Sequence, residues 1–347
     1  MSEPEVLFSQ QGALGRILLN RPRAINALTH DMVGMIDTQL DEWATDDSVA
    51  AVVVTGAGER GLCAGGDIRS IYEDAQEQGG ASEQFWADEY RLNLKISRYP
   101  KPYIAIMDGL VMGGGVGVSV HGSHRIATDR SRIAMPEVGI GFVPDVGGTY
   151  VLSRSPGVSG LHAGLTGAQM GAADAIHTGF ADAYIPHDRV EDFLAAVADG
   201  THPDAAVQEF AEQPEPGTFE DLEALADCYA HDTAAQIVAA MEADGSDLAT
   251  KTAATIRANS PVSVEVTLAA IRRVRELPDL AEALRQELRV SIHALRTGDF
   301  VEGIRAQIID KDRNPQWQPA RLEDVDPDVV AAYFDSLGDE ELVLPDA

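Results

Sequence analysis

Short apolar stretches that alternate with amphipathic helical patterns are the feature that most constrains the fold of the N-terminal half of this chain. Residues 5–20 have the pattern of two strands joined by a Gly-containing turn, and buried strands are predicted at residues 49–58 and 102–109. Between the strands, residues 29–46 and 82–99 carry apolar side chains at helical spacing. Strands that alternate with helices in this way predict an α/β fold.

The pattern changes after about residue 156, where the chain becomes mainly helical. Polar breaks separate helical patterns at residues 187–199, 203–212, 219–230, 233–243 and 246–258, and two more follow within residues 260–295. We therefore predict a core of residues 1–200 that holds the functional site. A mainly helical C-terminal extension of residues 201–347 is expected to pack on this core.

The acidity of the chain argues against several classes of partner. The sequence has 56 Asp and Glu residues against 26 Lys and Arg residues, and the net charge of −30 opposes binding to nucleic acids or anionic membranes. Only Cys63 and Cys228 are present, and the 9 histidines show no H-E-x-x-H spacing, so no metal site is expected. We see neither a signal peptide nor an apolar run of ~20 residues, and expect a soluble cytoplasmic protein.

Three Gly-rich stretches could carry chemistry, at residues 61–70, 109–122 and 134–150. The first two each follow a predicted buried strand. Because glycine lets the backbone approach a ligand closely, two such loops could hold an oxyanion between two backbone N–H groups. The alternative is that these glycines only permit tight turns.

The familiar nucleotide and hydrolase motifs do not fit these stretches. The sequence contains no phosphate-binding G-x-x-x-x-G-K-[ST] motif. Ser119 lies in "GVSVHG", where His121 takes the place of the second glycine of a G-x-S-x-G elbow. We therefore expect His121 to have a structural or hydrogen-bonding role.

The third stretch, "AMPEVGIGFVPDVGGTY", carries Glu137 and Asp145 among glycines, prolines and apolar side chains. An acidic group in apolar surroundings is costly unless it is hydrogen-bonded or functional. Two nearby acids in an apolar pocket tend to have separated pKa values, which suits one general acid and one general base. Asp145 could instead cap a helix that begins just after it.

Five motifs in order carry a family resemblance: "LNRPRAINAL", "GLCAGGDIR", "MDGLVMGGGVG", the third Gly-rich stretch and "DFVEGIRAQIIDKDRNPQW". Together they resemble the crotonase (enoyl-CoA hydratase/isomerase) superfamily over roughly residues 5–320. The resemblance implies a spiral of ββα units and an acyl-CoA thioester substrate, with coenzyme A as part of the substrate and no separate cofactor. It also implies an oxyanion hole formed by the N–H groups of Gly66 and Gly114.

The details of the motifs favour one branch of this superfamily. Its hydratases carry a catalytic Glu two residues beyond the GGG run, where this chain has Gly117, although the second hydratase Glu matches Glu137. Asp145, "SVHG" and "FWADEYRLN" are similar to the 3-hydroxyisobutyryl-CoA hydrolases. That resemblance implies Glu89, Gly114, Glu137 and Asp145 as the substrate-binding and catalytic set.

The implied reaction is hydrolysis of a 3-hydroxyacyl-CoA thioester, most specifically 3-hydroxyisobutyryl-CoA in valine catabolism. Glu137 could act as general base or as nucleophile, and Asp145 could orient Glu137, protonate the departing thiolate or bind substrate. Glu89 lies between Phe85 and Leu92 on one helical face and could accept a hydrogen bond from the substrate hydroxyl. Alternatively, Glu89 is an ordinary solvated helix residue.

Arg23 and Arg69 lie in motifs where related proteins place basic residues near the coenzyme A phosphates, although either could be an ordinary surface charge. Two other functions stay open: an enoyl-CoA hydratase or isomerase, and an acyl-CoA-binding protein without turnover. We expect neither nucleic acid nor membrane as a partner, and the resemblance allows a homo-oligomer.

Overall fold

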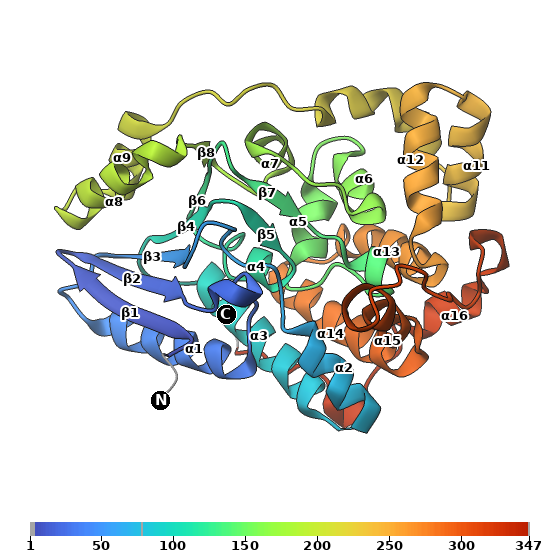
Figure 1. Ribbon diagram of the computed structural model, residues 1–347, viewed down its shortest axis with the longest axis horizontal. Helices are drawn as coiled ribbons and strands as arrows, with labels where there is room; N and C mark the ends of the chain where they lie inside the picture. Colours follow the sequence, from blue (N-terminus) through green and yellow to red (C-terminus); the bar gives the residue numbers. More distant parts are fainter. Residues whose placement is uncertain (1–3, 78, 346–347) are drawn as a thin grey trace. The chain divides into compact units, whose positions relative to one another are not determined.

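The computed structural model describes residues 4–77 and 79–345, and the chain divides into two compact units. Unit 1 comprises Met1–Asp67, Asp88–Ala134 and Gln169–Gly217, whereas unit 2 comprises Ile68–Ala87, Met135–Ala168 and Thr218–Ala347. All the strands of the described residues lie in unit 1, and the described part of unit 2 is helical (Figure 1). The α/β fold class predicted from the alternating pattern is confirmed.

The main sheet of unit 1 has six strands in the order β1-β2-β3-β4-β6-β8. β1 and β2 are antiparallel, and each of the other neighbours is parallel. A second, two-stranded parallel sheet pairs β5 with β7. The strands are β1 (Val6–Gln11), β2 (Leu14–Leu19), β3 (Ala51–Gly56), β4 (Tyr103–Met107), β5 (Leu110–Met112), β6 (His124–Ala127), β7 (Arg132–Ala134) and β8 (Ala183–Tyr184).

The central strands are apolar at nearly every position because a parallel sheet is covered on both faces. Val53 of β3, Ile104 of β4 and Ile126 of β6 belong to one buried cluster with Phe193 of α8 (Val190–Ala198) and Phe210 of α9 (Pro203–Phe210). In Figure 1 these two helices lie beside β4, β6 and β8. The loops that follow these strands are therefore anchored on a well-packed sheet.

Helices complete both units. Thr29 caps α1 (His30–Thr45), its hydroxyl accepting a hydrogen bond from the N–H of Met32. Besides α1, α8 and α9, the helices of unit 1 are η1 (Pro22–Ala24), α4 (Gly114–Gly117), α7 (Ala172–Thr178) and η3 (His187–Arg189). Helix α3 (Ala81–Ser97) is shared, with residues 81–87 in unit 2 and residues 88–97 in unit 1. The helices of unit 2 are α2 (Ile68–Glu77), η2 (Glu137–Ile140), α5 (Gly148–Arg154), α6 (Ser159–Thr166), η4 (Phe219–Leu225), α10 (Ala226–Tyr229), α11 (Ala234–Asp244), α12 (Asp247–Ala258), α13 (Pro261–Val274), α14 (Leu280–Thr297), α15 (Asp299–Ile304), the π-helix η5 (Arg305–Ile309), η6 (Leu322–Asp324), α16 (Pro327–Ala332) and η7 (Gly338–Glu340).

The chain beyond residue 200 is helical, as the sequence predicts, but the compact units are not separated at that residue. Segments from both halves of the chain enter each unit, because packing groups helices by contact and not by position in the sequence. The division into a core of residues 1–200 and an extension of residues 201–347 stays a prediction. Among the described residues, no helix is long and apolar enough to cross a membrane.

Candidate active site

In unit 1, the first two Gly-rich stretches run side by side. The N–H of Leu62 donates to the carbonyl of Asp108 at 2.9 Å, and the N–H of Met112 donates to the carbonyl of Cys63 at 3.0 Å. The buried side chain of Asn26 fixes the first loop, because its amide donates to the carbonyls of residues 57, 61 and 62. The ends of the two stretches are thereby held together.

Gly66 and Gly114, the predicted oxyanion residues, are neighbours at these ends. A Cβ added at Gly114 would lie 3.3 Å from the nitrogen of Gly66 and 3.1 Å from Cδ1 of Leu28. Within the described residues, neither Gly66 nor Gly114 donates a backbone hydrogen bond to another backbone group. Two adjacent N–H donors of this kind could bind one oxyanion.

Glu89 lies beside the same glycines. Its Oε1 would be 2.5 Å from a Cβ added at Gly114, so only glycine fits there without displacing the carboxyl. Glu89 is 2% exposed, and Phe85 and Leu92 on the same face of α3 are buried with it. The inward orientation predicted from helical spacing is confirmed, and the solvated alternative is wrong because the apolar face of α3 turns inward.

In unit 2, Glu137 opens the short helix η2 in a buried position. It is 6% exposed, and its Oε2 has no hydrogen-bond partner among the described residues. Burial raises the pKa of Glu137 well above its usual value, and the nearby carboxyls of Asp145 and Glu287 raise it further. A buried carboxyl with a raised pKa is a candidate for proton transfer.

Asp145 lies in a tightly bent loop of unit 2. It is 5% exposed, and its carbonyl accepts a 2.6 Å hydrogen bond from the N–H of Gly148. Val146 next to it has a φ of 51°, which is left-handed and costs a β-branched residue roughly 1–3 kcal/mol. The N-cap residue of α5 is Gly147, two residues after Asp145, and the alternative that Asp145 caps this helix stays open.

Glu287 of α14 is a third buried acid in this group, and the sequence reasoning missed it. Its Oε2 accepts a hydrogen bond from the N–H of Gly147 at 2.6 Å, and its Oε1 accepts one from the N–H of Thr149 at 3.0 Å and another from the Thr149 hydroxyl. Burial raises its pKa to about 8, against the effect of these hydrogen bonds. The sequence did contain a signal for this buried acid, because Glu287 lies between Leu284 and Leu288 on an apolar helical face.

Ser119, which tempts a hydrolase interpretation, is hydrogen-bonded to the backbone of its own turn. The hydroxyl of Ser119 donates to the carbonyl of Gly115 at 2.7 Å, inside a fully buried turn. His121 is half-buried and has at least one interaction partner. The structural or hydrogen-bonding role expected for His121 stays a prediction.

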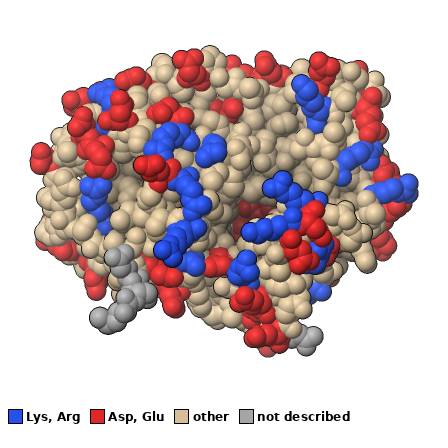
Figure 2. Space-filling model, viewed as in Figure 1, with Lys and Arg blue, Asp and Glu red and all other residues tan. Residues whose placement is uncertain are grey.

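Arg23 and Arg69 are both exposed, in unit 1 and unit 2 respectively. Arg23 has one basic neighbour, because the guanidinium of Arg60 donates to the Arg23 carbonyl at 2.7 Å. On the face drawn in Figure 2, Asp and Glu lie mainly toward the edges, and Lys and Arg gather in separate groups, several of them nearer the middle. A local basic group can therefore meet an anionic ligand on this acidic protein.

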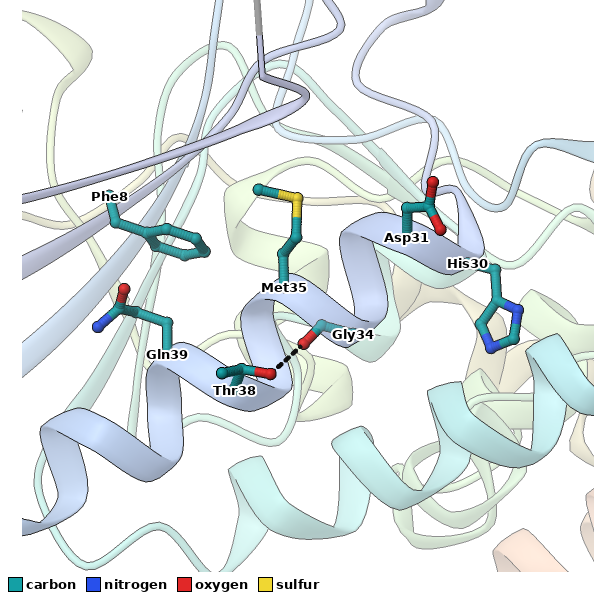
Figure 3. Close-up of a pocket in the computed structure, with 7 residues that line it drawn as sticks. All are labelled: Phe8, His30, Asp31, Gly34, Met35, Thr38 and Gln39. Atoms are coloured by element: carbon teal, nitrogen blue, oxygen red, sulfur yellow. Dashed lines mark hydrogen bonds between the residues drawn. The ribbon is translucent and has the colours of Figure 1, made fainter.

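A separate pocket in unit 1 lies on α1, away from the predicted residues. Figure 3 shows its lining of Phe8 from β1 and, from α1, His30, Asp31, Gly34, Met35, Thr38 and Gln39. None of the predicted site residues lines it. In residues 4–77 and 79–345, no group of three or more His, Cys, Asp or Glu side chains is arranged to hold a metal ion.

Sequence comparisons agree with the motifs. The sequence model of the enoyl-CoA hydratase/isomerase family matches residues 14–334. The 3-hydroxyisobutyryl-CoA hydrolase of Danio rerio, named as mitochondrial, is 38% identical over 98% of this chain and 92% of its own length. The human protein of the same name is 37% identical over 97% of this chain and 90% of its own length.

Solved structures confirm the crotonase-like fold but carry different names. A carnitinyl-CoA dehydratase from Mycobacterium thermoresistibile is 51% identical with a TM-score of 0.94, covering 98% of this chain and 99% of that one. An enoyl-CoA hydratase from Rhodobacter sphaeroides 2.4.1 is 40% identical with a TM-score of 0.92, covering 98% of this chain and 100% of that one.

Proposed function

Because this chain belongs to the enoyl-CoA hydratase/isomerase family, we propose that it hydrolyses the thioester of a 3-hydroxyacyl-CoA, with 3-hydroxyisobutyryl-CoA as its substrate. The names of the curated relatives support this reaction. With this substrate the protein would act in valine catabolism. The cytoplasmic location stays a prediction, since those relatives are named as mitochondrial.

The observation that carries the proposal is the buried pair formed by Glu137 and Asp145. Each is about 5–6% exposed, and Asp145 is close enough to raise the pKa of Glu137. At residue 117, where the related hydratases carry their other carboxylate, the chain has a buried glycine that supplies no side chain. The acids available for chemistry therefore match a hydrolase better than a two-glutamate hydratase.

In this proposal the N–H groups of Gly66 and Gly114 bind the thioester oxygen. Both donors are fixed by the pairing of their loops before the substrate arrives, so they need no reorganisation as negative charge develops. Glu89 beside them accepts a hydrogen bond from the substrate 3-hydroxyl.

Glu137 then activates the attack on the carbonyl carbon. As general base it would take a proton from water, and as nucleophile it would form a mixed anhydride that water cleaves. In either case the C–S bond breaks, and the departing thiolate needs a proton. Asp145, which is buried in the same stretch of sequence as Glu137, could affect this proton transfer. The coenzyme A phosphates are proposed to bind at Arg69 and at Arg23, which has Arg60 beside it.

Incubation of the purified protein with 3-hydroxyisobutyryl-CoA tests the function directly. We expect free thiol, measured with a thiol reagent, and an equal amount of 3-hydroxyisobutyrate, measured by mass spectrometry. A folded protein that releases no thiol above the rate of the Glu137→Gln variant would contradict the proposal.

The second candidate is a lyase that adds or removes water, because the two solved structures above are named as a dehydratase and a hydratase. An enoyl product without free thiol in the same incubation would favour it. Tight binding without either product would instead favour an acyl-CoA-binding protein.

A further inference from the structure

The loop that carries Asp145 has a backbone conformation that the sequence alone does not favour. Val146 has a φ of 51° and Gly147 a φ of 77°. A left-handed conformation is easy for Gly147, but it is unfavourable for the β-branched side chain of Val146. Such a conformation persists only where its surroundings hold it.

Glu287 binds this loop from a distant part of the sequence. Its carboxyl binds the N–H of Gly147, two residues after Asp145, and both the N–H and the hydroxyl of Thr149. Glu287 is 1% exposed and is anchored on the long helix α14 (Figure 1). Both of its oxygens are used on this one loop.

We propose that Glu287 is a positioning residue, which holds Val146 in its left-handed conformation and so sets the place of Asp145 beside Glu137. The inference rests on the proposed function, because it takes this pair to be the reacting acids. Without the hydrogen bonds to Glu287, Val146 can relax toward a negative φ, and Asp145 then moves relative to Glu137. A shift of ~1 Å in a reacting group can cost about a hundredfold in rate.

Glu265 of α13 provides a matched control within the same unit. Its carboxyl accepts hydrogen bonds from the N–H groups of Ala234 at 3.0 Å and Ala235 at 3.1 Å, at the start of α11. Like Glu287, it is a buried acid that binds two backbone N–H groups at a helix start. Neither Glu137 nor Asp145 is among the groups that influence its pKa.

The test compares Glu287→Gln with Glu265→Gln in the full chain, using thiol release from 3-hydroxyisobutyryl-CoA. The amide nitrogen of Gln cannot accept a hydrogen bond, so each variant loses part of its backbone contact. We expect both to lower Tm, but only Glu287→Gln to lower kcat, by about 10–100-fold, with KM changed less than ~2-fold. If Glu287→Gln fails to fold, Thr149→Val provides a milder test, because it removes only the hydrogen bond between the Thr149 hydroxyl and Glu287.

Relief of the strain should partly restore the rate. Glycine tolerates a φ of 51°, so adding Val146→Gly to Glu287→Gln should recover several-fold of the lost kcat. A normal kcat in Glu287→Gln or Thr149→Val, with lowered Tm, would overturn the proposal and leave Glu287 as a structural cap. No recovery on adding Val146→Gly would overturn the role of Val146. If the wild type itself releases no thiol, the failure belongs to the proposed function.

Discussion

In unit 1 the proposed site is made of two backbone N–H groups with one carboxyl beside them, whereas in unit 2 it is made of three buried carboxyls. The donors of unit 1 are fixed by loop pairing and keep one state at every pH. The acids of unit 2 can gain or lose protons, and burial, followed by the neighbouring carboxyls, raises the pKa of Glu137. Unit 1 is thus suited to binding and polarising the thioester, and unit 2 to moving protons.

The largest effect is expected in unit 2. Glu137→Gln keeps the size of the side chain but removes both the base and the nucleophile. We expect kcat to fall by about 10²–10⁴-fold, with Tm unchanged or raised because a buried ionisable group is removed. Thiol release measures kcat, and thermal melting measures Tm. A variant with near-normal kcat would remove Glu137 from the chemistry.

A smaller effect is expected from crowding the donors of unit 1. Gly114→Ala places a Cβ 2.5 Å from Oε1 of Glu89 and 3.3 Å from the nitrogen of Gly66. We expect kcat to fall by about a hundredfold, as when one oxyanion donor is lost. Adding Glu89→Ala should recover part of the rate, because the nearest clash disappears.

Gly34→Ala is the control, since a Cβ there has no neighbour within 4 Å. It lies inside α1 and should raise stability by about 0.5–1 kcal/mol without changing kcat. If Gly114→Ala behaved in the same way, the donors at Gly66 and Gly114 would have no role in the reaction.

Glu89 should affect substrate choice more than rate. A site built to bind a hydroxyl discriminates against a substrate without it, because its own polar group is left unpaired. We expect the ratio of kcat/KM for 3-hydroxyisobutyryl-CoA over isobutyryl-CoA to fall about tenfold or more in Glu89→Ala. An unchanged ratio would show that another group recognises the hydroxyl.

The smallest expected effect is a shift in pH dependence. Glu137 must be ionised to act, so the raised pKa predicts that activity falls as the pH drops through a value above the usual 4.5. The charge of Asp145 contributes to this rise, so Asp145→Asn should move the acid limb to lower pH while also lowering kcat. An acid limb at the same pH in both proteins would mean that Asp145 does not act on Glu137.

Much of this arrangement could be predicted from local sequence, and the remainder depends on distant contacts. The helical spacing of Phe85, Glu89 and Leu92 predicts an inward carboxyl, and α3 bears this out. A helix just after Asp145 is anticipated from the sequence, and α5 (Gly148–Arg154) begins there. Glu287 could not be assigned a partner, since Gly147 and Thr149 lie 140 and 138 residues away from it.

The most direct measurement follows free thiol and enoyl absorbance together, in parallel samples of the purified protein with 3-hydroxyisobutyryl-CoA and crotonyl-CoA. Hydrolysis predicts rapid thiol release from the first substrate and negligible loss of enoyl absorbance from the second. Rapid hydration of crotonyl-CoA without thiol release from either substrate would contradict the account.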